Sequence, residues 1–307
     1  MNFSVSVVIP CFNEKDNIEI LYRHLSKVLE IYPELELIFV DDGSTDATLE
    51  AIRSVAEKDP GVRYISLSRN FGHQYALKAG LDHAGGDCVI SMDADMQHPP
   101  ELIPVMIEKW REGYEVVNTI RGDQKSLSAS KKFSSGLFYF IINRLSSVEI
   151  KPGIADFRLL DRKVVDALKQ FSENHIFLRG LIPWMGFRQT SVHFEPAERH
   201  KGTTKYTFTR MLRLALDGIT SFSSRPLYLS IALGSIIAGI AFLYGIYAVY
   251  VHLFTDDALP GWTSITASVL FIGGIQLIML GIIGIYLGKL FIENKKRPNY
   301  IIRAKNF

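Results

Sequence analysis

Two long runs without a charged residue constrain this 307-residue chain more than any other feature. The first extends from Leu227 to Val251 and the second from Ala258 to Gly288. Each run is longer than the roughly 20 apolar residues that a helix needs to cross about 30 Å of hydrocarbon. A helix buried in a protein core is the alternative, but two such runs are unusual in one soluble domain. The sequence therefore predicts two transmembrane helices within residues 226–292.

The charges beside these runs predict the orientation of the spans. The connector from Phe254 to Gly261 holds Asp256 and Asp257 and no Lys or Arg. Basic residues instead precede the first run and follow the second: Arg210, Arg213, Arg225, Lys289, Lys295, Lys296, Arg297, Arg303 and Lys305. Because Lys and Arg are enriched on the cytoplasmic side, the N-terminal domain and both termini are expected in the cytoplasm, with residues 293–307 as a basic tail.

The segment at residues 206–225 shows a helical pattern with two different faces. Its apolar face comprises Phe208, Met211, Leu212, Ala215, Ile219 and Phe222. Arg210, Arg213 and Asp217 fall on the other side. The pattern predicts an amphipathic helix that lies in the membrane interface or packs on the preceding domain.

Glycines in the second uncharged run are spaced for close helix contact. Gly284 and Gly288 form a G-x-x-x-G pair, and Gly281 lies one turn earlier. Such spacing lets two helix backbones approach each other, within one chain or between copies. Assembly into a homo-oligomer is one interpretation of this pattern, and the ordinary tolerance of glycine in lipid is the other.

Composition excludes several classes of protein. The chain has 34 Lys and Arg against 32 Asp and Glu, a net charge of +2, which is not that of a polybasic nucleic-acid binder. Its two cysteines, Cys11 and Cys88, cannot build a disulfide framework or a zinc cluster. The mean hydropathy of +0.13 is high for a chain with 21% charged residues, so the apolar residues must be concentrated in part of it.

Residues 1–205 alternate between strand-like and helix-like segments. The strand-like runs are Phe3–Ile9, Leu35–Val40, Val62–Leu67, Cys88–Met92 and Val116–Ile120. A helical pattern between the first two places Ile18, Leu21, Leu25, Val28 and Leu29 on one face. This alternation predicts an open, mostly parallel α/β sheet, in which ligands bind at the carboxyl ends of the strands. The chain has neither a G-x-G-x-x-G after its first strand nor a P-loop, so the sequence supports neither dinucleotide nor Walker-type ATP binding.

Polar residues follow three of these strands. They are Asn13 and Glu14 after the first, Asp41 and Asp42 after the second, and Asp93 and Asp95 after the fourth. Carboxylates gathered at one edge repel each other unless a cation neutralises them, and oxygen ligands suit Mg²⁺ or Mn²⁺. An ion held by one or two carboxylates usually completes its shell with substrate phosphates. Each element alone could be a loop or a helix cap, but the ordered set predicts a site for a nucleotide diphosphate and a divalent ion.

These residues resemble glycosyltransferase family 2, of the GT-A fold, and especially its polyprenyl-phosphate branch. That branch contains the dolichol-phosphate mannose synthases and the bacterial bactoprenol glucosyltransferases. The likeness extends over essentially the whole chain and rests on Val7–Glu14, Asp41–Asp46, Arg69–Gly72, Asp93–Pro99, Arg199–Tyr206 and the two C-terminal spans. These motifs are specific for the branch and poor at naming the sugar.

The resemblance implies a role for each motif residue. The nucleotide-sugar pocket would be lined by Pro10, Asn13, Glu14, Asp42, Asp93 and Arg121. The metal ligands would be Asp95, Asp93 and Gln97. The catalytic residues would be Asp156, Asp95 and Arg121, and the lipid phosphate would be bound by Lys131, Arg199, Lys201 and Lys205. Thr204 stands where the family often has Ser, which keeps the hydroxyl.

The implied reaction is the transfer of one sugar, with inversion, from a nucleotide diphosphate to undecaprenyl phosphate or another polyprenyl phosphate. Glucose from UDP-glucose is the first expectation, and GDP-mannose, UDP-GlcNAc or an aminosugar donor fits the same motifs. The Gln-x-x-Arg-Trp motif of processive synthases is absent, so a single transfer is expected. The expected location is the cytoplasmic face of the bacterial inner membrane. The resemblance also admits a flippase and a downstream glycosyltransferase as partners, and a non-catalytic membrane scaffold is the remote alternative.

The chemistry of the acceptor limits what Asp156 has to do. A phosphate monoester has a second pKa near 6, so most of it is dianionic at neutral pH and already carries a nucleophilic oxygen. We therefore expect Asp156 to position the acceptor, or to act as a base only for its protonated fraction. Loss of Asp156 should then be less damaging than loss of Asp95, which would help to stabilise charge on the leaving diphosphate.

Overall fold

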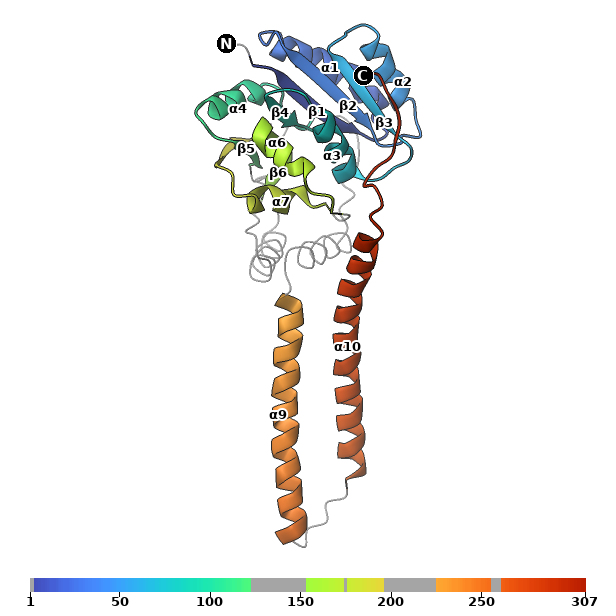
Figure 1. The fold of residues 1–307 in the computed structure, drawn as a ribbon, viewed down its shortest axis with the longest axis vertical. Coiled ribbons are helices and arrows are strands. Elements are labelled where there is room, and N and C mark those ends of the chain that lie inside the picture. The colour runs from blue at the N-terminus through green and yellow to red at the C-terminus, as the bar shows by residue number, and fades with distance from the viewer. Residues whose placement is uncertain (1–2, 123–152, 174–175, 196–224, 255–260) are drawn as a thin grey trace.

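The computed structural model describes residues 3–122, 153–173, 176–195, 225–254 and 261–307. An α/β domain stands at one end of two long helices that extend away from it side by side (Figure 1). The expected lipid-phosphate residues Lys131, Arg199, Lys201 and Lys205 lie outside the described residues. So does nearly all of the expected amphipathic helix.

The described strands form one eight-stranded sheet in the order β7-β5-β6-β4-β1-β2-β3-β8. Their bounds are β1 Val5–Cys11, β2 Leu35–Asp41, β3 Val62–Leu67, β4 Cys88–Ser91, β5 Val116–Arg121, β6 Ile154–Asp161, β7 Gln189–Phe194 and β8 Ile302–Lys305. The five predicted strands are confirmed to within two residues at each end. β1 is buried along its whole length, because helices cover both faces of the sheet at its centre.

The sheet is less uniformly parallel than the sequence predicts. β4, β1, β2 and β3 run parallel to one another, and β5 runs parallel to β7. β6 lies antiparallel between β4 and β5, and β8 is antiparallel to β3. The expectation of a mostly parallel sheet therefore holds for the centre, and the whole is a mixed sheet. Strands β6, β7 and β8 are not among the predicted ones.

Helices pack on both faces of the sheet and enclose two apolar cores. Helices α1 (Lys15–Leu29), α2 (Thr48–Ala56) and α4 (Leu102–Arg111) cover one face. Helices α3 (His73–His83), α6 (Arg162–Lys169) and α7 (Leu178–Trp184) cover the other. In α1 the predicted face is confirmed, with its members buried except Val28, which is only partly buried.

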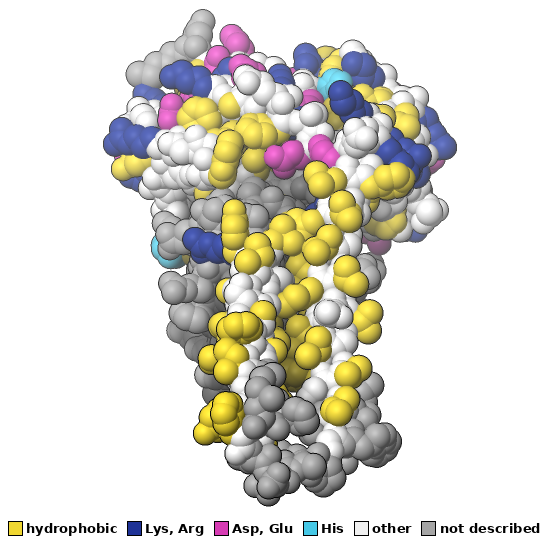
Figure 2. Space-filling model, turned by 60° about the horizontal axis from the view of Figure 1, so that its bottom comes forward, with side chains coloured by type: hydrophobic (Ala, Val, Ile, Leu, Met, Phe, Trp, Pro, Cys, Tyr) yellow, Lys and Arg dark blue, Asp and Glu magenta, His cyan; other side chains and the backbone are white. Residues whose placement is uncertain are grey.

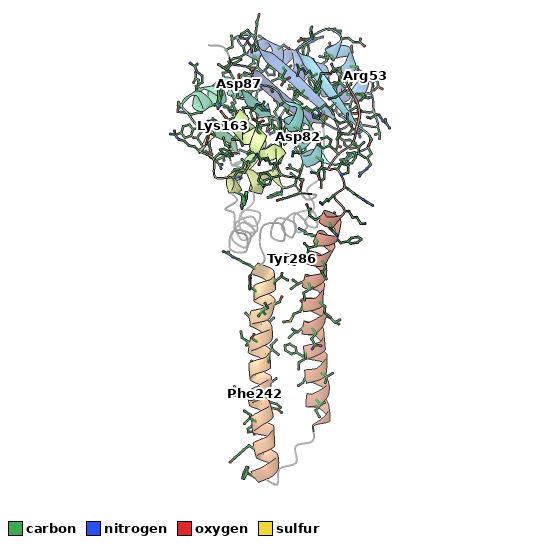
Figure 3. The ribbon with its side chains drawn as sticks, viewed as in Figure 1. Arg53, Asp82, Asp87, Lys163, Phe242 and Tyr286 are labelled. Atoms are coloured by element: carbon green, nitrogen blue, oxygen red, sulfur yellow. The ribbon has the colours of Figure 1, made fainter. Side chains whose placement is uncertain are left out.

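The two uncharged runs form helices α9 (Arg225–Phe254) and α10 (Trp262–Asn294). Apolar side chains line both of them, whereas Lys, Arg, Asp and Glu gather on the domain and at the helix ends next to it (Figure 2). Figure 3 labels Phe242 on α9 and Tyr286 on α10, both outside the domain.

Only one helix among the described residues is long and apolar enough to cross a membrane. It is Phe271–Asn294, with a mean hydropathy of 2.1 and none of it buried inside the protein. The apolar stretch of α9, Ser230–Tyr244, is shorter than the roughly 20 residues that a span requires. The prediction of two transmembrane helices is therefore not confirmed, although both predicted segments are helical.

After α10 the chain returns to the domain. Residues Ile302–Lys305 form β8 and pair with the edge strand β3, with Ile302 opposite Leu67 and Lys305 opposite Ile65. The sequence analysis places these residues in a cytoplasmic tail and does not anticipate a strand there. The C-terminus consequently lies beside β3 on the α/β domain (Figure 1).

Candidate active site

The loops after β1 and β2 are joined by hydrogen bonds at the carboxyl edge of the sheet. The Asn13 N–H donates to Ser44 Oγ at 3.0 Å, and the Thr45 N–H donates to Asn13 Oδ1 at 2.9 Å. The Glu14 N–H donates to Thr48 Oγ1 at 2.9 Å. The expected convergence of these two strand-end loops is thus present. The side chain of Asn13 serves to connect them, while Pro10 is buried at the end of β1.

Asp42 is buried and organises the loop that precedes α3. Its carboxylate accepts hydrogen bonds from the N–H groups of Phe71 at 2.7 Å and Gly72 at 2.9 Å. Burial raises the pKa of Asp42, and these two N–H groups oppose the increase. Next to it, Gly43 has a φ of +66°, and a Cβ there would lie 2.4 Å from the carbonyl carbon of Arg69. The motifs Asp41–Asp46 and Arg69–Gly72, which are separate in the sequence, are therefore packed and hydrogen-bonded together.

The loop after β4 is held by two histidines. His73 Nε2, at the start of α3, donates to Asp93 Oδ1 at 2.7 Å, and the Asp93 N–H donates to His98 Nδ1 at 3.0 Å. Burial disfavours the ionised form of Asp93, but the hydrogen bond and charge of His73 outweigh it, so the pKa of Asp93 is lowered. Burial lowers the pKa of His98, whose ring stacks on Phe157 with centroids 5.0 Å apart.

The tip of this loop presents Asp95 and Gln97. Between them Met96 has a φ of +62°, a conformation that is unfavourable for a residue with a side chain and is typical of functional sites. This turn lets the Gln97 N–H donate to Asp95 Oδ1 at 3.1 Å. From the end of β5, Arg121 Nη2 donates to Gln97 Oε1 at 3.1 Å. The predicted residues Asp93, Asp95, Gln97 and Arg121 are thus brought together at one edge.

The donors at this edge fit a hard divalent cation that is shared with a substrate. Asp95 and Gln97 are half-buried and offer carboxylate and amide oxygens, the ligand types that Mg²⁺ and Mn²⁺ prefer. Burial raises the pKa of Glu14, and the charges of Asp95, Asp46 and Asp93 raise it further, so the edge carries a negative field. Within the described ranges, no group of three or more His, Cys, Asp or Glu could hold an ion by itself. A cation here would need further ligands, such as those of a diphosphate.

Asp156, at the start of β6, is buried between two arginines. Arg158 Nη2 donates to Asp156 Oδ1 at 2.9 Å, and Arg179 Nη2 donates to Oδ2 at 2.9 Å. Gln74 Nε2 also donates to Oδ2, at 3.3 Å. Burial disfavours the ionised carboxylate, but the charges of Arg179 and Arg158 outweigh burial and hold the pKa of Asp156 far below its ordinary value. A carboxylate with so low a pKa is a weak base at neutral pH, which favours the positioning role.

Four residues that the sequence analysis does not select surround these carboxylates: His73, Gln74, Arg158 and Arg179. Arg158 lies two residues after Asp156 in a strand, so the alternation of side chains could have placed both on one face. His73 and Gln74 directly follow the Arg69–Gly72 motif. Arg179 is far from Asp156 in the sequence and lies on α7, and no local pattern indicates their contact.

Comparison with known proteins identifies the family of this chain. Residues 6–169 match the model of the family described as glycosyl transferase family 2. The chain belongs to this family and is a glycosyltransferase, as the sequence motifs predict, and its mixed α/β sheet is consistent with the GT-A fold.

Relatives match it over nearly their full length. The chain is 44% identical over 299 residues to the glycosyltransferase YkcC of Bacillus subtilis, covering 97% of this chain and 93% of that one. It is 41% identical over 300 residues to the bactoprenol glucosyl transferase of Shigella phage SfV, covering 97% and 98%. A solved mannosyltransferase from Pyrobaculum calidifontis, in complex with GDP-Man and Mn²⁺, is 19% identical with a TM-score of 0.49, covering 96% and 87%.

Proposed function

We propose that this glycosyltransferase transfers a single glucose from UDP-glucose to undecaprenyl phosphate, or a similar polyprenyl phosphate, with inversion. The observation that carries the proposal is the likeness to bactoprenol glucosyl transferases, which extends over 97% of this chain and 98% of the relative from phage SfV. A likeness over the full length includes the helices as well as the α/β domain.

The edge of the sheet supplies the groups that this reaction needs at the donor. Cleavage at the anomeric carbon builds negative charge on the leaving diphosphate, and preorganised cations stabilise such charge. Arg121, exposed at the end of β5 and hydrogen-bonded to Gln97, would bind the diphosphate from one side. A divalent ion held by Asp95 and Gln97, with Asp93 beside them, would supply Lewis-acid stabilisation of the same charge. Asp42, Asn13, Glu14 and Pro10 would line the nucleoside pocket.

The acceptor side needs orientation more than a base. The lipid phosphate is mostly dianionic at neutral pH, so it attacks without first losing a proton. Asp156, ionised and held by Arg158 and Arg179, would fix the local charges that orient this phosphate. Lys131, Arg199, Lys201 and Lys205, which lie outside the described residues, would bind the phosphate near the membrane surface.

The helices would place the enzyme in the bacterial inner membrane with the domain in the cytoplasm. Under this proposal α9 and α10 both span the bilayer within residues 226–292, residues 1–205 are catalytic, residues 206–225 lie in the interface and residues 293–307 are cytoplasmic. The flanking Lys and Arg support this orientation.

The glycines of α10 support assembly into a homo-oligomer. Within the described residues, nothing lies within 4 Å of a Cβ added to Gly281, Gly284 or Gly288, so this side of α10 is open to a second copy. A flippase and a downstream glycosyltransferase would use the lipid-linked product.

The decisive experiment uses membranes that contain this chain, supplied with undecaprenyl phosphate, Mg²⁺ or Mn²⁺ and one labelled donor at a time. UDP-glucose, UDP-GlcNAc and GDP-mannose are tested separately, and label extracted into organic solvent is counted. The proposal expects label from UDP-glucose that disappears in Asp95→Ala. Label from another donor alone would replace glucose with that sugar. If no donor gives label, the proposed transfer to undecaprenyl phosphate fails, and another acceptor or a scaffold role takes its place.

A further inference from the structure

The last eight residues, Tyr300–Phe307, connect α10 to two elements of the candidate active site. We call this segment the C-terminal strap. It runs from the domain end of α10 along the edge of the sheet and ends beside β3 (Figure 1). Because only a short link separates the strap from α10, its contacts connect the α/β domain to that helix.

The link between α10 and the strap is short. Helix α10 ends at Asn294, and Lys296 turns the chain with a φ of +48°. Lys295–Asn299 separate the helix from the strap, and a chain of this length spans at most about 18 Å when fully extended. The end of α10 must therefore stay close to the point where Tyr300 is bound.

The strap first contacts α3. Tyr300 packs against the apolar core on this face of the sheet, and its hydroxyl donates to Asp82 Oδ2 at 2.9 Å. Asp82, labelled in Figure 3, also pairs with Lys78 one turn earlier in α3. The other end of α3 carries His73 and Gln74, which contact Asp93 and Asp156. Helix α3 thus joins the strap to Asp93 and Asp156, two carboxylates of the candidate active site.

The strap also holds the end of β3. Ser68 is the first residue after β3, and its N–H donates to the carbonyl of Ile301 at 2.9 Å. The chain from Ser68 continues directly to Phe71 and Gly72, whose N–H groups bind Asp42. A second contact thus connects the strap to the nucleoside side of the site.

The far end of the strap is secured as well. The Tyr64 N–H donates to Asn306 Oδ1 at 2.7 Å, and Asn306 Nδ2 donates to the carbonyl of Val62 at 3.2 Å. The guanidinium of Arg63 lies 5.1 Å from the centroid of the Phe307 ring. Contacts at both ends and along β8 make the strap an integral part of the sheet rather than a loose tail.

We propose that the C-terminal strap positions the catalytic site over the membrane, by tying α10 to the segment from β3 to α3, which carries His73 and Gln74 and whose loop binds Asp42. The proposal rests on the proposed function in one respect, namely that the acceptor is a membrane lipid. Its residues are positioning residues and touch no substrate. The short link fixes the position of the site relative to α10. The strap contacts fix the shape of the loop between β3 and α3, whose Phe71 and Gly72 bind Asp42.

The first test lengthens the link and leaves the strap intact. Inserting Gly-Ser-Gly-Ser between Arg297 and Pro298 keeps all the strap contacts but lets the domain change its distance from the end of α10, and so from the membrane. We expect the affinity for the nucleotide sugar to stay within about twofold, and transfer to polyprenyl phosphate in vesicles to fall by at least about tenfold, because small misplacements of reactants are costly. Transfer in vesicles at the wild-type rate would overturn the proposal.

The second test removes one strap contact and uses a matched control. Tyr300→Phe deletes the hydroxyl that binds Asp82, while Tyr22→Phe deletes a hydroxyl that donates to Asp59 Oδ2 at 3.0 Å on the opposite face of the sheet. We expect kcat for transfer to fall by about two- to tenfold in Tyr300→Phe, and to stay within about twofold in Tyr22→Phe, at equal melting temperatures. Equal kcat values in the two variants would contradict the coupling through α3.

A third measurement does not depend on activity. Amide hydrogen exchange on the full-length chain and on a chain that ends at Asn299 should show faster exchange of Ser68 and Tyr64, and of Phe71 and Gly72 beyond them, when the strap is absent. Unchanged exchange at Phe71 and Gly72 would show that the strap does not support the loop between β3 and α3. If the wild-type chain transfers no sugar, the proposed function fails, whereas this measurement still decides on the strap.

Discussion

Asp156 and Arg179 form a two-pronged ion pair between the start of β6 and helix α7. Arg179 Nε donates to Asp156 Oδ1 at 3.1 Å, and Arg179 Nη2 donates to Oδ2 at 2.9 Å. The Asp156 side chain is 7% exposed and that of Arg179 is 33% exposed, so the pair joins the buried sheet to the open edge. Arg158 contacts the same carboxylate from the interior. One carboxylate is therefore shared by two cations, which leaves the group a net positive charge beside the site where phosphates are expected.

Replacing Asp156 by Asn should impair activity to the same extent at every pH from about 5.5 to 8. The two arginines keep the pKa of Asp156 far below this range, so the wild-type carboxylate is ionised throughout. The measurement is the transfer rate of both forms across pH, at saturating donor. A loss confined to the acidic side would instead identify Asp156 as a base for the protonated acceptor.

The same substitution should cost stability in a way that depends on pH. The pKa of Asp156 is lower in the folded than in the unfolded state, so its contribution is fully present above the unfolded pKa of about 3.9 and is lost as the pH falls through the folded value. Removing one partner of a buried ion pair usually costs about 3–5 kcal/mol. Denaturant unfolding should show this difference at pH 7 and a smaller one below about pH 4. A difference that does not change with pH would contradict the assignment.

Replacing Arg179 should separate charge from geometry. A lysine keeps the positive charge but cannot form two parallel hydrogen bonds to Asp156. We expect Arg179→Ala to lower kcat/KM for the lipid phosphate by about 10- to 100-fold, and Arg179→Lys to recover only part of the loss. Arg53→Ala is the matched control, since Arg53 lies on helix α2 and packs over the ring of Tyr64 in β3. Full recovery by lysine would show that charge alone matters.

Removal of divalent ions should abolish transfer reversibly, and Asp95 should control the response. We expect chelation to stop transfer, added Mg²⁺ or Mn²⁺ to restore it, and Asp95→Ala to lower kcat by at least about 100-fold with little recovery at high metal concentration. Asp166→Ala is the control, because Asp166 is exposed on α6 and pairs only with nearby surface cations in the described structure. Full activity of Asp95→Ala at ordinary Mg²⁺ would remove Asp95 from the metal site.

Gly80 should be intolerant of even one added methyl group. It lies where α3 crosses the sheet, and a Cβ there would lie 2.2 Å from Val8 Cγ1 and 3.0 Å from Val40 Cγ2. We expect Gly80→Ala to lower the free energy of unfolding by about 1–3 kcal/mol, which is typical of an overpacked core. In Gly85→Ala the new methyl would lie 3.5 Å from Glu36 Oε1, an ordinary contact, so its melting temperature should change little.

The central part of the fold was predictable because its signals are local. β1, β2 and β3 are short runs in which most residues are apolar, a pattern typical of strands in a buried sheet, and α1 shows its buried stripe in the spacing of Ile18, Leu21, Leu25 and Leu29. The carboxyl ends of parallel strands meet at one edge, so Asp42, Asp93 and Asp95 could be assigned to a common site before their coordinates were known. Local patterns of this kind also predicted helices α9 and α10.

The strand β8 shows what local patterns cannot predict. Residues Ile302–Lys305 are too few and too charged to be recognised as a strand, and they become one because the edge of β3 offers unpaired backbone groups. The sequence suggested a cytoplasmic tail because its Lys and Arg residues dominate the pattern. The pairing of β8 with β3 is made by backbone groups, which all these residues have whatever their side chains, so the sequence gives no signal of it.

The sequence by itself determined which oxygen donors stand at the carboxyl edge of the sheet, since it sets the residue types that follow each strand and parallel strands end at the same edge. Tertiary structure alone decided the burial, the ion pairs and the pKa of Asp156. Arg179 comes from a distant helix, and its approach to within 2.9 Å, together with the charge of Arg158, lowers the pKa of Asp156 and holds its side chain in place. The physical reason is that burial and ion pairing depend on distances between residues that are remote in the chain, and those distances exist only once the domain is folded.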